Sequence, residues 1–248
     1  MKISQPSESA INSPALRFRN VTKNYGASQI LREIDLEIDK GEFFGLVGMN
    51  GAGKTTLIKC LLDFCALDKG AIEIFETSHR LTESRKPLAF LPERFMPPYY
   101  LTGMDFLKYM LKLQSVAYDR SETEAILHAL DLSPSALTRP VRSYSKGMTQ
   151  KLGLAACFLA KKDAYVLDEP MSGLDPKARA LLKFKFQDLR RAGCTMFFSS
   201  HALADVEEIC DKMAILHKGK IRFIGSPKDC CQEFKADTLE HAYLRCID

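Results

Sequence analysis

The chain has 248 residues, of which 46% are hydrophobic and 27% are charged, and its formal net charge is +4. These values, with ordinary glycine and proline contents, exclude collagen-like and wholly disordered proteins. The longest uncharged apolar runs are far shorter than the ~18 residues that a membrane span needs, and no secretory signal is visible. We therefore expect one or two globular domains, and neither a channel nor a carrier. The mild, interspersed positive charge does not by itself indicate a nucleic-acid partner.

The first part of the chain predicts a polar tail followed by strands and one helix. Residues 1–14 are Ser-rich and contain Pro6 and Pro14, so we expect a disordered tail. Alternating or continuous apolar runs predict strands beyond it. In chain order we expect strands from Ala15, at 30–38 and at Phe43–Val47, a helix at 54–66, and strands at 71–75 and Leu88–Leu91.

The second part predicts a block of helices and then an alternation of strands and helices. Apolar residues at three-to-four spacing predict helices within 95–162, at 104–113, 122–132 and 146–160. Beyond them we expect a strand at 164–167, a helix at Pro176–Arg191, a strand at 194–199, a helix at 202–210, a hairpin around Lys218-Gly219 and a last helix near 238–246. This alternation indicates an α/β core, with 95–162 as a helical insertion.

The eight cysteines show no metal-ligand spacing. We expect reduced thiols, most of them inside apolar stretches. Cys230 and Cys231 fall in a polar stretch and are expected to be the most exposed.

A glycine-rich segment follows the strand Phe43–Val47. Residues 48–55, Gly-Met-Asn-Gly-Ala-Gly-Lys-Thr, fit the pattern G-x-x-x-x-G-K-[ST] between a strand and a helix. The glycines let backbone N–H groups surround phosphate oxygens, and the helix N-terminus adds its dipole. Lys54 can reach the β- and γ-phosphates, and the Thr55 hydroxyl can ligate Mg²⁺. The segment therefore predicts a nucleotide phosphate site.

Two carboxylates end a second apolar strand, at residues 165–169, Tyr-Val-Leu-Asp-Glu. A carboxylate at the C-terminal edge of a strand beside a phosphate loop can hold the Mg²⁺ shell, which is the role we expect for Asp168. Glu169 lies one residue further on and can polarise a water as general base.

With these motifs the chain resembles the nucleotide-binding domain of an ATP-binding cassette (ABC) protein from Ala15 to its C-terminal end. Residues 142–148, Arg-Ser-Tyr-Ser-Lys-Gly-Met, resemble the family signature, and residues 172–175, Ser-Gly-Leu-Asp, resemble its D-loop. His201 matches the switch histidine, and Tyr25 the aromatic residue that stacks on adenine. The resemblance implies an α/β fold with a RecA-like P-loop core, an antiparallel β subdomain and an inserted helical subdomain, within one domain at 15–248.

The resemblance also implies the site residues. Catalysis would fall to Glu169, His201 and Lys54, and Mg²⁺ to Thr55, Asp168 and Glu93. ATP would be bound by Tyr25, Gly48, Asn50, Gly51, Ala52, Gly53, Lys54, Thr55, Thr56, Ser145 and Gly147. Three positions depart from the family. Glu93 stands where Gln is usual, Lys146 replaces the first signature Gly, and Met148 replaces the Gln that follows the signature glycines.

As a function, the resemblance implies an ATP-hydrolysing subunit of a multi-chain transporter at the cytoplasmic face of the cell membrane. A second ATP-binding domain would enclose two ATP molecules, a separate transmembrane permease would supply the pathway, and no nucleic acid would be a partner. The form of the signature and residues 238–244 resemble the ATPases of bacterial ABC-2-type exporters. Two alternatives stay open. One is a soluble ABC ATPase that remodels a ribosome or DNA complex, and the other is an unrelated phosphate-loop kinase or GTPase, although no Asn-Lys-x-Asp guanine motif is present.

Overall fold

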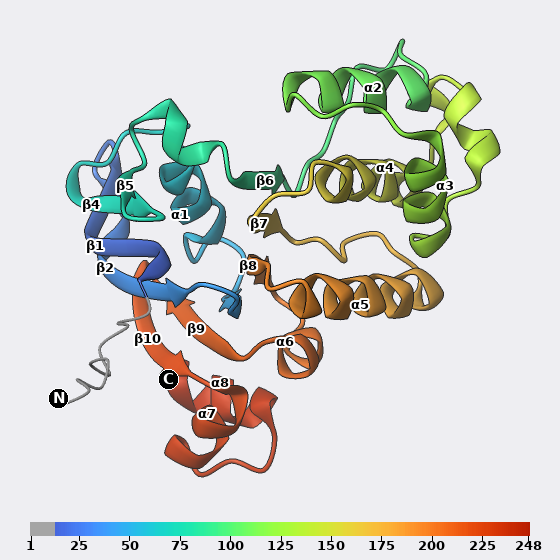
Figure 1. Cartoon of the computed structure of the whole chain (residues 1–248). Helices are drawn as coiled ribbons and strands as arrows, with labels where there is room; N and C mark the ends of the chain where they lie inside the picture. Colours follow the sequence, from blue (N-terminus) through green and yellow to red (C-terminus); the bar gives the residue numbers. More distant parts are fainter. Residues whose placement is uncertain (1–12) are drawn as a thin grey trace, which may run out of the picture.

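A computed structural model describes residues 13–248. An antiparallel sheet lies at one side of the molecule, with strand order β2-β1-β4-β5 (Figure 1). Its strands are β1 (Pro14–Tyr25), β2 (Ser28–Asp39), β4 (Lys69–Ile74) and β5 (Thr77–Ser78). The predicted tail lies outside the described residues except at its end, where Pro14 already pairs with Asp39 in β1, so the prediction is too long there.

A second, six-stranded sheet forms the centre of the molecule, in the order β10-β9-β3-β8-β7-β6. Five of its strands, all but β10, run parallel to one another. Strand β10 pairs antiparallel with β9, and the two form the predicted hairpin. Its strands are β3 (Phe43–Val47), β6 (Leu88–Leu91), β7 (Ala164–Asp168), β8 (Thr195–Ser200), β9 (Lys212–His217) and β10 (Lys220–Gly225). Strands β3, β7 and β8 are buried along their whole length, as continuous apolar runs predict.

One core lies between the two sheets and contains α1 (Lys54–Leu61). Leu57, Ile58 and Leu61 of this helix are fully buried with residues of both sheets. The helix is shorter than the predicted 54–66, because Asp63 adopts a left-handed backbone conformation, φ 60°, that a helix cannot continue through.

The other face of the central sheet is covered by α5 (Pro176–Arg191), α6 (Leu203–Ile209) and the C-terminal helix α8 (Leu239–Ile247). Helix α6 packs closely on β3 at Gly45, where a Cβ would lie 2.8 Å from Cys210 Sγ. Asp175 caps α5 by accepting a hydrogen bond from the Ala178 N–H at 2.8 Å, and Pro176 occupies the first turn.

Between β6 and β7 the chain leaves the sheet and forms α2 (Gly103–Leu113), α3 (Arg120–Ala129) and α4 (Lys146–Leu159), which pack together at the edge of the molecule (Figure 1). Residues 95–102 contain no helix, and short 3₁₀ turns lie at Thr82–Arg85, Pro134–Thr138 and Val141–Ser143. Thr102, Asp119 and Ser145 cap the three α-helices. The helices fall inside the predicted 95–162 block, whose limits as a subdomain remain a prediction.

The prediction for Cys230 is wrong, because this residue is fully buried in a helix, α7 (Pro227–Glu233), that was not predicted. Ser226 and Asp229 form a capping box with Pro227 in the first turn, and Cys230 then faces the core. Cys231 is half-buried, and all eight cysteines are free thiols. The α/β class, with an antiparallel sheet and inserted helices, is confirmed. Within residues 13–248 no helix is both long and apolar enough to cross a bilayer.

Candidate functional site

The predicted site residues come together at the carboxyl ends of three neighbouring parallel strands. In the register of the sheet, Val47 of β3 pairs with Ser200 of β8, and Asp168 of β7 pairs with Ser199. The glycine-rich loop, the two carboxylates and His201 follow these strand ends. This edge of a parallel sheet is where α/β proteins bind their ligands, since loops from several strands meet there.

The loop after β3 needs glycine at three positions. Gly51 and Gly53 have φ values of 82° and 115°, which a residue with a Cβ rarely adopts. At Gly48 a Cβ would lie 2.4 Å from the Leu216 carbonyl oxygen of β9. The turn of the β9–β10 hairpin also reaches the loop, because the Gly219 N–H donates to the Ala52 carbonyl at 3.2 Å. The hairpin therefore supports the loop from outside the cavity.

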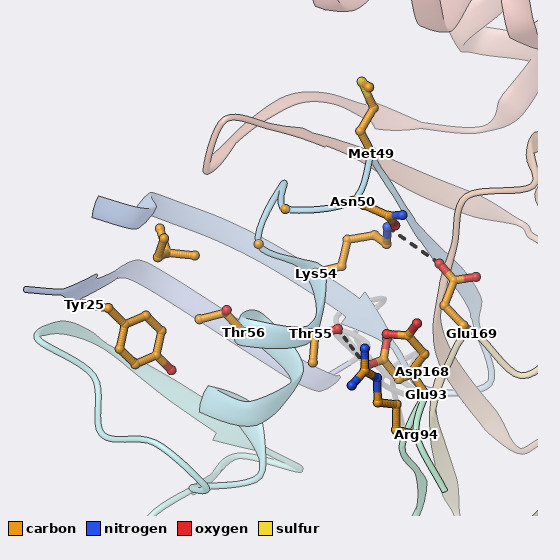
Figure 2. Close-up of a pocket in the computed structure, with 13 residues that line it drawn as sticks. Tyr25, Met49, Asn50, Lys54, Thr55, Thr56, Glu93, Arg94, Asp168 and Glu169 are labelled. Carbon is orange, nitrogen blue, oxygen red and sulfur yellow. Dashed lines mark hydrogen bonds and ion pairs between the residues drawn. The ribbon is translucent and has the colours of Figure 1, made fainter. Parts of the chain in front are cut away.

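Lys54 opens α1 and is almost fully buried, with 7% of its surface exposed. Its Nζ donates to the Gly48 carbonyl oxygen at 2.6 Å and lies 3.6 Å from Glu169 Oε1 (Figure 2). The ammonium group is thus held at the cavity between its own loop and a carboxylate. An incoming phosphate could exchange with either partner.

A chain of hydrogen bonds joins α1 to the two strand ends. The Thr55 hydroxyl donates to Asp168 Oδ2 at 2.9 Å, and the Ser199 hydroxyl donates to Asp168 Oδ1 at 2.5 Å. The same serine oxygen accepts the backbone N–H of Glu169 at 3.0 Å. Hydroxyl and carboxylate oxygens are the donors that Mg²⁺ prefers, so Thr55 and Asp168 fit that ion. Glu93 also lines the cavity and adds a third oxygen donor.

Glu169 lies between two basic groups. Its Oε1 faces Lys54, whereas His201 Nδ1 lies 2.9 Å from its Oε2. The Glu169 side chain is 9% exposed, and its backbone has a φ of 51°, an unusual value for a glutamate. The Gln150 amide supports this turn by donating to the Pro170 carbonyl at 3.0 Å. Because it lies beside both a lysine and a histidine, Glu169 is the strongest candidate for chemistry.

Tyr25 lies at the far end of the same cavity, as the last residue of β1 before the turn to β2 (Figure 2). Half of its surface is exposed, and Lys23 Nζ lies 5.2 Å from the centre of its ring. A hydrogen bond with the Cys65 thiol, together with burial, raises the pKa of Tyr25 to about 12. The ring is therefore neutral at physiological pH and offers an aromatic face to a base.

The cavity that joins these groups has a volume of about 440 Å³. Most of the predicted binding residues line it, but Gly48 and Ala52 do not, and neither does the predicted catalytic residue His201. The lining residues are Tyr25, Ile30, Met49, Asn50, Gly51, Gly53, Lys54, Thr55, Thr56, Glu93, Arg94, Asp168 and Glu169.

Ser145 and Gly147 do not line this cavity; they open α4 in the helical block. Ser145 Oγ accepts the Met148 N–H at 3.2 Å, which caps the helix. The segment packs on the 172–175 turn: Lys146 Nζ donates to Ser172 Oγ at 3.2 Å, and a Cβ at Gly147 would lie 3.0 Å from the Gly173 carbonyl. Within one chain, the signature-like segment and the phosphate loop therefore form separate surfaces.

Three residues that matter for the geometry were not predicted: Ser199, Gln150 and Arg94. Ser199 lies near the end of a buried strand that pairs with the strand of Asp168. A polar residue at the end of an apolar strand is the sequence feature that could have indicated its role. Arg94 follows Glu93 directly, and its charge next to an unusual carboxylate was a signal too. No sequence pattern pointed to Gln150.

Comparison with known proteins identifies the family. The ABC transporter family profile matches residues 31–172. The chain is 37% identical over 200 residues to an uncharacterized ABC transporter ATP-binding protein of Synechocystis, across 79% of this chain and 56% of that protein. It is 32% identical to the lantibiotic transport ATP-binding protein SrtF of Streptococcus pyogenes, across 83% of this chain and 88% of SrtF. The chain belongs to the ABC transporter family.

Solved structures agree with this assignment. The ATP-binding subunit of an ABC transporter superposes with a TM-score of 0.85 at 28% identity, over 94% of this chain and 99% of that one. A bacterial Atm1-family ABC exporter with ATP bound shares the fold, with a TM-score of 0.81 at 20% identity, over 95% of this chain and 42% of that one. The predicted resemblance is confirmed, and the chain is an ABC ATP-binding domain. It spans 56% and 59% of the length of two of the relatives that it matches.

Proposed function

We propose that this ABC domain is the ATP-hydrolysing subunit of a multi-chain transporter, an exporter in particular, that drives a separate transmembrane permease from the cytoplasmic face of the membrane. The observation that carries the proposal is the position of Glu169, between Lys54 and His201, at a cavity lined by the phosphate loop. A buried carboxylate next to a phosphate site is what hydrolysis by a polarised water requires.

ATP would lie along the cavity from Tyr25 to Asp168. The Tyr25 ring would stack on the base, and the loop from Gly48 to Thr56 would surround the phosphates with backbone N–H groups. Lys54 would leave the Gly48 carbonyl and bind the β- and γ-phosphates. Thr55, Asp168 and Glu93 would hold Mg²⁺, which neutralises phosphate charge when it is bound.

In the hydrolysis step, the Glu169 carboxylate would accept a proton from the attacking water. Lys54 and His201 lie beside the two oxygens of this carboxylate. His201 would keep that carboxylate in place from the exposed side and contact the γ-phosphate. The protein would contribute positioning and charge neutralisation and form no covalent intermediate.

The position of the signature-like segment supports a second ATP-binding domain as partner. Ser145 and Gly147 lie at a helix N-terminus, a favourable place for an anion, but outside the chain's own cavity. A second domain packed head-to-tail would bring these residues to the γ-phosphate and enclose two ATP molecules between the two domains.

The exporter assignment rests on relatives. The chain is 32% identical to the bacitracin transport ATP-binding protein BcrA of Enterococcus faecalis, across 82% of this chain and 66% of BcrA, and SrtF is named for lantibiotic transport. We therefore place the chain among ATPases that serve export, with the cargo chosen by the permease.

The test is purification of the Glu169→Gln chain with ATP in mild detergent, with the co-purifying proteins identified by mass spectrometry. The variant should hold nucleotide and stay assembled, and a polytopic membrane protein should appear in stoichiometric amount. The Lys54→Ala chain is the control, because it loses the group that binds phosphate. Ribosomal proteins or nucleic acid without a membrane chain would favour a remodelling ATPase instead.

A further inference from the structure

Arg94 has no role in the site described so far, although its side chain lines the same cavity. It follows Glu93 in the connection from β6 to α2. Figure 2 shows its guanidinium group directed toward Thr55 and Asp168. Across residues 13–248, no carboxylate forms an ion pair with this group. An unpaired guanidinium beside three carboxylates has its donors free for another anion.

The charge on the cavity wall favours the same conclusion. Lys54 and Arg94 are its cationic residues, whereas Glu93, Asp168 and Glu169 are anionic. Without Arg94, a single ammonium group would face three carboxylates and a triphosphate. Glu93 stands where the family usually has a neutral Gln, so this chain carries one extra negative charge at that position. The next residue, Arg94, supplies a positive charge beside it.

The position along the cavity indicates which phosphate is reached. Figure 2 shows Tyr25 and Arg94 at opposite ends, with the phosphate loop between them. Arg94 also shares a neighbouring hollow of about 390 Å³ with Thr55 and Asp168. A nucleotide whose base lies at Tyr25 therefore has its terminal phosphate at the Arg94 end.

We propose that Arg94 binds the terminal phosphate of ATP and offsets the charge of Glu93, an inference that rests on the proposed ATP site. The planar guanidinium can donate two parallel hydrogen bonds to phosphate oxygens, which a lysine ammonium cannot reproduce. Because ADP lacks this phosphate, Arg94 should distinguish the two nucleotides, whereas Lys54 should matter for both.

The experiment compares the affinities of wild type and variants for a non-hydrolysable ATP analogue and for ADP by calorimetry with Mg²⁺. Arg94→Ala should weaken analogue binding roughly 10-fold or more, the value of a charge-assisted hydrogen bond, and leave ADP binding within about 2-fold. Arg94→Lys should recover only part of the loss. Arg120→Ala, an exposed arginine on α3, is the matched control and should change neither affinity.

Two results would overturn the proposal. Equal affinities of Arg94→Ala and wild type for the analogue would remove Arg94 from the site. Full rescue of Arg94→Ala by Glu93→Gln would mean that Arg94 only neutralises its neighbour and does not contact phosphate. If wild type binds neither nucleotide while Arg94→Ala and wild type melt at the same temperature, the ATP site itself is wrong, which is a separate failure of the proposed function.

Discussion

Glu169 has two basic neighbours, each on a different oxygen, and a backbone conformation that few glutamates adopt. An isosteric amide keeps the shape of this group and one acceptor oxygen, but it cannot take a proton from water. Replacement by glutamine therefore separates binding from chemistry.

We predict that Glu169→Gln slows ATP hydrolysis by ~10²–10⁴-fold and leaves ATP affinity within a few-fold of wild type. Steady-state phosphate release and equilibrium nucleotide binding are the measurements. Near wild-type turnover in this variant would remove Glu169 as the general base. Asp175→Asn is a useful comparison, since that carboxylate also ends a turn but only caps α5.

His79 is a second titratable residue whose surroundings set its charge. It is 2% exposed; its Nδ1–H donates to the Ile72 carbonyl at 3.0 Å, and its Nε2 is buried without a hydrogen-bond partner. Burial lowers the pKa of His79 below its ordinary value of 6.5. The nearby charges of Arg80 and Arg85 lower this pKa further, whereas the charge of Asp63 raises it. The folded protein therefore binds a proton at this imidazole less readily than the unfolded chain does.

This lowered pKa predicts a loss of stability in acid. As the pH falls below about 6.5, His79 becomes protonated in the unfolded chain before it does in the folded chain. The free energy of unfolding therefore decreases until the pH passes the pKa of the folded state. His79→Gln should flatten this slope between pH 7.5 and 5.5, measured by urea denaturation.

At the scale of elements, the phosphate loop and the β9–β10 hairpin depend on each other. Gly48 lies against the Leu216 carbonyl and Gly219 donates to the Ala52 carbonyl, so the loop is held from the side away from ATP. A buried backbone contact of this kind has no flexible side chain that could move aside.

We predict that Gly48→Ala displaces the loop from the hairpin, because its Cβ would lie 2.4 Å from the Leu216 oxygen. ATP affinity should fall by about 10-fold or more, and the melting temperature should fall as well. Gly193→Ala is the control: its φ of 77° makes an alanine strained, but the space around it is open and far from the loop. It should cost about 1–2 kcal/mol of stability and leave ATP affinity unchanged.

At the scale of the whole molecule, the phosphate loop and the signature-like segment of one chain lie on separate surfaces. The phosphate loop lines the cavity, whereas Ser145 and Gly147 lie at the start of α4, where Lys146 and Gly147 pack on the 172–175 turn. In a head-to-tail pair, each complete site would take its phosphate loop from one chain and its signature segment from the other.

This arrangement predicts complementation. Ser145→Arg and Lys54→Ala should each abolish ATPase activity alone, but a mixed dimer would contain one site built from two intact halves. An equal mixture should regain about a quarter of wild-type activity if chains pair at random. Activity that stays at zero in the mixture, with mixed dimers present by mass, would contradict the composite site. A mixture of Lys54→Ala with Glu169→Gln is the control, since both defects lie in the same half-site and the mixture should stay inactive.

The sequence by itself determined the family and most of the strands and helices. A short glycine-rich pattern between an apolar strand and a helix, followed by Asp168-Glu169 and His201 in order, is specific because phosphate binding restricts which residue types fit. The helix α7 was also encoded, in Ser226, Pro227 and Asp229, but it was missed because seven residues give little apolar periodicity. Because the helix was not predicted, the burial of Cys230 within it was not predicted either.

Only the tertiary structure decided which distant residues meet. The order of the strands in the central sheet places Ser199 beside Asp168, and no local pattern contains that neighbour relation. The same is true of Arg94, whose direction depends on where the chain leaves β6, and of Ser145, whose separation from the cavity depends on how α4 packs. Local residue types determine chemistry and element type, whereas sheet order and helix packing determine distance, because both depend on contacts between segments far apart in the chain.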